Sequence, residues 1–190
     1  MLALALDAGM RAIKWEVGAV PGTSVKTWAY PNGLHLGAFL VPSYKLKVTG
    51  TTDSDAVSTT VFDVLRFGVI CKDGTSASIV GLAHYQTHTI KGWIPTYVVH
   101  SANSPENGAW QVYEDFLIHD GPDGPGESFA SIGCVEIMGL QGFVKFNDLL
   151  ISLSGIKKPS RGAALGEIGK SRQLSITYQA ASRPPLVKVP

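Results

Sequence analysis

Two residues of this sequence, Cys134 and His119, have side chains that together could carry out nucleophilic chemistry. They lie fifteen residues apart in the segment FLIHDGPDGPGESFASIGCVEI, residues 116–137. A thiolate is a strong nucleophile, and an imidazole can take the thiol proton and later give it to a leaving group. Either residue alone is more often structural, so the surrounding sequence must decide between a catalytic pair and a buried cysteine near an ordinary histidine.

The residues around Cys134 suit attack on a carbonyl group. Gly133 has no side chain, so the backbone can turn sharply there and a substrate can approach closely. The backbone N–H groups of Gly133 and Cys134 could then face a developing oxyanion. His119 ends an apolar, strand-like run before a loop of Gly, Pro and acidic residues, which would put its ring at the rim of a sheet.

The elements that must position these residues are predicted to be mostly strands. Alternating, β-branched and aromatic patterns between turn residues predict strands in six segments: residues 44–50, 61–74 (a strand and a turn), 76–88, 95–102, 109–119 (one or two strands) and 174–179. The polar residues 51–60 are predicted to form a loop.

One main helix is predicted after Cys134. Four apolar residues recur there at helical spacing and a glycine follows as a stop: Phe146, Leu149, Leu150, Leu153 and Gly155. Residues 160–172 could hold a short second helix.

Many short strands separated by turns predict a mostly β sandwich or barrel-like core, and 190 residues suit one domain. Residues 1–43 show no clear pattern. We expect them to be an irregular N-terminal segment, packed on or appended to a core that spans residues 44–190.

The composition excludes several classes of protein. With a net charge of +1 and no cluster of Lys or Arg, the sequence has no field that would recruit nucleic acid or an anionic membrane. No window approaches eighteen apolar residues, so no membrane span is predicted. The N-terminus lacks the basic start and long apolar run of a secretory signal, which leaves a cytoplasmic protein, export by another route, or a mature form.

The second cysteine, Cys71, is predicted to be a small buried strand residue.

The complete pattern is more specific than its two central residues. It runs from Phe-x-Ile-His on a predicted strand, through a Gly/Pro loop, to Ser-x-Gly-Cys, an apolar residue and a helix. This pattern resembles the catalytic domain of the L,D-transpeptidases, the YkuD-like family of peptidoglycan enzymes, over residues 76–155. The upstream PTYVVHSA and GAWQV segments are similar to the family's strand that leads to the active-site histidine.

By this resemblance, Cys134 is the nucleophile and His119 is its base. Ser131 and Gly133 match the serine and glycine of the family motif. In the family, a neighbouring backbone carbonyl holds the second ring nitrogen of the histidine. The carbonyl of Asp120 is the first choice for that role here, and the Asp120 side chain is the alternative.

Aromatic and histidine side chains upstream of the motif are candidates for the wall of a substrate cleft. Tyr97, His100 and Trp110 are the candidate substrate-binding residues.

Two positions depart from the family pattern. The family often has His where this chain has Ile132, and Arg where it has Glu136. An arginine could bind a substrate carboxylate, and a glutamate could not. The Ser-x-Gly-Cys form without the second histidine is similar to variants among interbacterial effectors, which also lack an N-terminal signal.

The resemblance implies a cysteine-dependent peptidoglycan L,D-transpeptidase that acts on tetrapeptide stems through a thioester acyl-enzyme. We expect action in the bacterial cell envelope or periplasm, and for an effector, delivery by a dedicated secretion system and a cognate immunity protein as partner. Cross-linking, D-amino acid exchange and L,D-carboxypeptidase activity stay open as outcomes. An inactive interaction module on the same fold is the remaining alternative.

No metal or organic cofactor is expected. His84 and His88 have the His-x3-His spacing of a helical zinc site, but their surroundings predict a strand and no Glu follows His84. Asp120, Asp123 and Glu127 lack the fixed alternating positions of a calcium loop, so a solvated lid loop is favoured.

Overall fold

The computed structural model describes residues 11–99, 107–124, 129–130 and 132–190, and the chain there is mostly β, as predicted. Most strands join one large mixed sheet. Its strand order is β7 (Gln86–Thr89), β13 (Leu174–Tyr178), β1 (Ile13–Val17), β3 (Gly33–Thr51), β4 (Val57–Leu65), β12 (Val135–Ile137), β10 (Phe116–Asp120), β9 (Ala109–Tyr113) and β8 (Gly92–Ile94).

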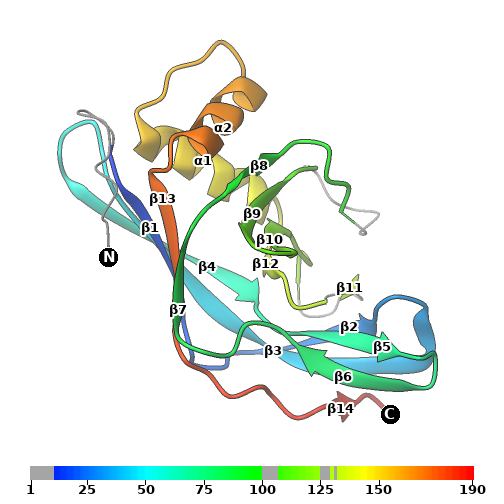
Figure 1. Cartoon of the computed structure of the whole chain (residues 1–190). Coiled ribbons are helices and arrows are strands. Elements are labelled where there is room, and N and C mark those ends of the chain that lie inside the picture. Colours follow the sequence, from blue (N-terminus) through cyan, green and yellow to red (C-terminus); the bar gives the residue numbers. More distant parts are fainter. Residues whose placement is uncertain (1–10, 100–106, 125–128, 131) are drawn as a thin grey trace.

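The long strand β3 connects the two ends of the molecule. Its second half pairs with β4 and its first half pairs with β2 (Ser24–Ala29). β11 (Phe129–Ala130) pairs with β2, and β14 (Val187–Lys188) pairs with β3. The hairpin of β5 (Gly68–Lys72) and β6 (Ser76–Val80) lies beside this lower end of the molecule in Figure 1.

Alternating burial explains why these segments form strands. Along β1, Ile13, Trp15 and Val17 are buried, while Lys14 is exposed and Glu16 is half-buried. One face of a strand can therefore pack on the core while the other meets solvent.

Two helices cover one face of the main sheet near β8 and β13 (Figure 1). α1 (Gly142–Ser154) buries Phe143, Phe146, Leu150 and Leu153 in the main core and ends at Gly155, which has φ +69°. The main helix was therefore predicted correctly. α2 (Arg161–Lys170) confirms the short second helix, and the Ser160 hydroxyl caps it by accepting from the Ala163 N–H. Neither helix in the described part of the chain is long and apolar enough to cross a membrane.

The structure corrects three predictions about elements. Residues 13–43 are not irregular, because they supply β1, β2 and part of β3 to the sheet. Within the polar segment 51–60, only the turn between Thr51 and Val57 is a loop, since β4 already begins at Val57. Residues 95–99 form no strand, and the rest of the predicted 95–102 strand lies outside the described residues.

Candidate active site

The pairing of β10 with β12 brings the two ends of the 116–137 segment together. The strands are parallel, and their register joins Ile118 to Val135 and His119 to Glu136. Residues paired in this way share a face of the sheet, and neighbours along a strand alternate between faces. Ile118 and Val135 belong to the core cluster beneath α1, which packs on both strands. His119 and Glu136 therefore lie on the opposite face.

Cys134 shares that opposite face with His119. It immediately precedes β12 and is two residues before Glu136, so the alternation gives both side chains the same direction. A backbone hydrogen bond from Leu117 of β10 reaches the thiol, which agrees with this register. Cys134 and His119 are diagonal neighbours on adjacent strands, roughly 7–8 Å apart at the backbone, a gap that these side chains can span.

The His119 ring is oriented by the backbone. Its Nδ1 lies 2.7 Å from the Asp120 carbonyl oxygen, and the ring is 5% exposed. A carbonyl oxygen can only accept, so Nδ1 carries the donated proton and Nε2 is the basic nitrogen of the neutral ring. Of the two partners expected from Asp120, the structure has the carbonyl. The Asp120 side chain follows His119 in the strand and so points to the other face.

The Cys134 thiol is buried and protonated. It is 5% exposed and lies 4.0 Å from the Asp115 carbonyl oxygen, which accepts its S–H. The pKa of Cys134 is raised to about 12, mainly by burial; the hydrogen bond from Leu117 opposes this rise, and the carboxylates of Glu136 and Asp115 add to it. Attack by this sulfur therefore needs a base to remove its proton.

Tyr97 packs against His119. Its ring centroid is 5.1 Å from that of His119, with the planes tilted by 32°. Burial raises the pKa of Tyr97 to about 12, with further contributions from Cys134, Glu136 and Tyr30, so its hydroxyl stays protonated at neutral pH. Tyr97, a candidate substrate-binding residue, therefore lies beside His119.

The turn before Cys134 requires a glycine. Gly133 has φ +92°, and a Cβ there would lie 2.8 Å from the Gly81 nitrogen. Residues other than glycine rarely adopt that backbone conformation, and the position of a Cβ is already occupied by the segment that follows β6. Gly81 was not singled out in the sequence, because its contact with Gly133 joins residues far apart in the chain.

Other expected site residues have different outcomes. Trp110 is not a substrate-binding residue, because it is 0% exposed in the main core and donates its indole N–H to the Asn147 side chain at 2.9 Å. Its position in β9 turns it towards α1. His100 and Ser131 lie outside the described residues.

Sequence reasoning noted Glu136 only as a departure from the family pattern. The structure buries it to 1% exposure beside His119. The signal was present in the sequence, since Val135 and Ile137 flank Glu136 and alternation puts a residue between them on the face of Cys134.

The residues considered as metal ligands are spread over separate elements. His88 lies in β7, stacks on Tyr113 at 4.6 Å and shares a hydrogen bond with Gln86 at 2.9 Å. His84 is in the loop before β7. Among the residues that the structure describes, no three His, Cys, Asp or Glu side chains are grouped to hold a metal ion. Cys71, predicted to be buried, is half-buried in β5.

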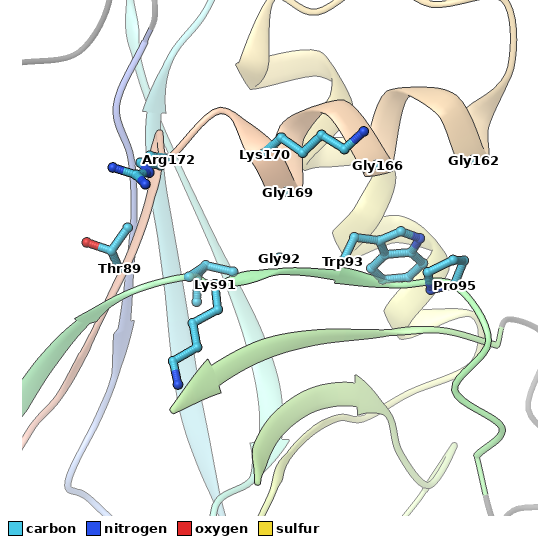
Figure 2. Close-up of a pocket in the computed structure, with 11 residues that line it drawn as sticks. Thr89, Lys91, Gly92, Trp93, Pro95, Gly162, Gly166, Gly169, Lys170 and Arg172 are labelled. Carbon is cyan, nitrogen blue, oxygen red and sulfur yellow. The ribbon is translucent and has the colours of Figure 1, made fainter. Parts of the chain in front are cut away.

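A separate pocket of about 780 Å³ lies between α2 and the segment that joins β7 to β8 (Figure 2). Neither Cys134 nor His119 lines it. Its basic side chains, Lys91, Lys170 and Arg172, point in different directions in Figure 2. Lys91 Nζ lies 5.9 Å from the centroid of the Tyr113 ring. The pocket therefore has no converging charged groups.

Comparison with known proteins identifies no relative of this chain. The chain matches no protein-family model, no curated protein sequence and no solved structure.

Proposed function

We propose that this protein is a cysteine acyltransferase that acts on peptidoglycan stem peptides as an L,D-transpeptidase. The observation that carries the proposal is the orientation of His119. Its Nδ1 is bound to the Asp120 carbonyl at 2.7 Å, which leaves Nε2 as the basic nitrogen on the face shared with Cys134. A cysteine and an oriented histidine on one face are the minimal groups for thiol-based acyl transfer.

The chemistry follows from the two groups. His119 Nε2 takes the Cys134 proton as Sγ bonds to the substrate carbonyl carbon, and the oxyanion forms near the turn at Gly133. The C–N bond then breaks, and the leaving amine takes the proton from His119. The acyl group remains on Sγ as a thioester. An amine acceptor or water attacks this thioester, gives its proton to His119 and returns the thiol.

The substrate proposed here comes from the family resemblance of the 116–137 segment. In it, Sγ attacks the carbonyl of the third stem residue, a meso-diaminopimelate joined to D-Ala, and the terminal D-Ala leaves. An acceptor stem amine gives a cross-link, a free D-amino acid gives exchange, and water gives carboxypeptidase activity. All three share the thioester.

The test is mass spectrometry of purified tetrapeptide muropeptides incubated with the protein. Dimers, exchanged tetrapeptides or tripeptides are expected, and they identify the acceptor. Cys134→Ala should abolish every product, while Cys71→Ala, which removes the other thiol, should retain them. Muropeptides left intact by the wild-type protein would refute the proposed substrate and favour the inactive interaction module.

Peptidoglycan lies in the cell envelope, so the proposed activity requires that the protein act there. Its proposed role is that of an antibacterial effector, delivered by a dedicated secretion system and countered by an immunity protein. Expression directed to the periplasm should then inhibit growth, and Cys134→Ala should remove the inhibition. Equal growth with periplasmic and cytoplasmic expression would contradict the effector role.

A further inference from the structure

Glu136 is buried and is the direct cross-strand neighbour of His119. The parallel register pairs the two residues on adjacent strands, and they share the face that also carries Cys134. Glu136 is 1% exposed and His119 is 5% exposed. Charges this close and this shielded from water interact much more strongly than a surface pair does.

The backbone and Glu136 act on His119 in different ways. The Asp120 carbonyl fixes the ring orientation by accepting from Nδ1, but it carries no net charge. In a catalytic triad, one carboxylate both orients the histidine and stabilises the imidazolium that forms during attack. Here the second task has a candidate of its own, since Glu136 is the direct cross-strand neighbour of the ring.

Glu136 also affects the nucleophile. Its carboxylate is among the groups that raise the pKa of Cys134, and it acts in the same direction on Tyr97. One negative charge therefore disfavours a resting thiolate and favours an imidazolium. Both effects suit a reaction in which the proton moves to His119 only as the sulfur attacks.

The other titratable or charged groups around this cluster come from several elements: Tyr97 after β8, Asp115 between β9 and β10, Asp120 in β10, Tyr178 in β13, Tyr30 beside Tyr97, and Arg66 beside Tyr178. Arg66 is the cation of this set. Its guanidinium donates to the carbonyls of Gly18, Leu82 and Gln179.

We infer that Glu136 is a positioning residue that holds the positive charge on His119 once the ring has taken the Cys134 proton. The role of Glu136 in catalysis rests on the proposed function. Its effect on the charges of His119 and Cys134 does not depend on a substrate. Removing the carboxylate should lower the pH at which both Cys134 and His119 titrate.

The test compares Glu136→Gln with the parent protein, both in a Cys71→Ser background. The rate of Cys134 alkylation by iodoacetamide is followed against pH by mass spectrometry, and His119 is titrated by NMR. We expect both midpoints to move to lower pH by about one unit, which is a roughly tenfold change in each proton-binding constant. Glu136→Asp, which keeps the charge, should stay nearer the parent.

Glu167→Gln is the matched control, because it removes one exposed carboxylate in α2 that pairs with Lys158 and should move neither midpoint. If Glu136→Gln does not fold, Glu136→Leu removes the same charge without leaving an amide to satisfy. Unchanged midpoints in a folded variant would overturn the inference. Absence of any muropeptide product, with shifted midpoints, would instead refute the proposed function alone.

Discussion

Cys134 differs from thiols that are ionised before they meet a substrate. Such thiols are partly exposed and lie near positive charge, which lowers their pKa. Cys134 is buried with the carboxylates of Glu136 and Asp115 as neighbours, and its pKa is raised to about 12. The thiol is therefore kept protonated, and a base such as His119 determines whether it can react.

This buried thiol should make stability depend on pH in the alkaline range. Its pKa rises from the ordinary 9.0 to about 12 on folding, so the folded state binds the proton more tightly than the unfolded state. The stabilisation is complete below pH 9 and is lost as the pH rises from there towards 12. Between pH 8 and pH 10, the wild type should lose about 1 kcal/mol more unfolding free energy than Cys134→Ala.

Urea unfolding at the two pH values measures this difference. Tyr97 and Tyr178 also have raised pKa values, mainly through burial and in smaller part through Cys134. Both proteins retain the buried tyrosines, so the thiol is the main difference between them. Equal losses in the two proteins would mean that Cys134 is ionised or solvated in the folded state.

At the scale of elements, the site depends on a close contact between two turns. The turn before β12 and the segment after β6 meet at Gly133 and Gly81, where neither glycine has room for a Cβ. Gly133 and Gly139 both have positive φ, at +92° and +98°, but a Cβ at Gly139 meets nothing within 4 Å. Substitutions at Gly133 and Gly139 can therefore separate the cost of backbone strain from the cost of crowding.

Alanine at these two glycines should have different effects. Gly139→Ala should cost about 1 kcal/mol of unfolding free energy, from backbone strain alone. Gly133→Ala adds a contact of 2.8 Å with Gly81, so its cost should exceed that of Gly139→Ala by at least about 1 kcal/mol. Denaturant unfolding measures both values, and equal costs would show that the Gly81 segment moves aside without loss.

Elements with a strong local signal could be predicted from the sequence, and those specified by distant partners could not. The α1 pattern from Phe146 to Leu153 is local and was sufficient. β2 is short and is flanked on both sides by prolines and glycines, so its local signal is weak. It forms because β3 and β11 pair with it. Residues 95–99 have β-branched and aromatic side chains, but strand propensity acts only where a partner strand is present.

The same division applies to the site. The types and spacing of Cys134 and His119 predict a pair, since both flank one local loop, and the β10–β12 pairing places them on adjacent strands. The burial of Glu136 beside His119 depends on the β10–β12 register, which the turn pattern does not specify. Trp110 was misassigned because an aromatic residue in a strand gives no sign of which face it occupies.

At the scale of the whole molecule, one buried side chain joins three distant parts of the chain. Arg66 follows β4 and is 0% exposed. Its guanidinium donates to Gly18 after β1 at 2.8 Å, to Leu82 after β6 at 2.8 and 3.0 Å, and to Gln179 after β13 at 2.5 Å. Through Leu82 it also anchors the Gly81 segment that contacts the turn before Cys134.

Arg66→Met should therefore affect both stability and the site. It keeps most of the side-chain volume but leaves three partly buried carbonyls without their donor, so we expect a loss of roughly 3 kcal/mol of unfolding free energy. Alkylation of Cys134 should also accelerate, because the segment covering Gly133 loses its anchor. The control is Lys45→Met, which breaks only an exposed pair with Asp63 and should change stability by less than about 0.5 kcal/mol. If Arg66→Met resembled this control in both measurements, the three strand ends would be held by packing alone, and the position of the Gly133 turn would not depend on Arg66.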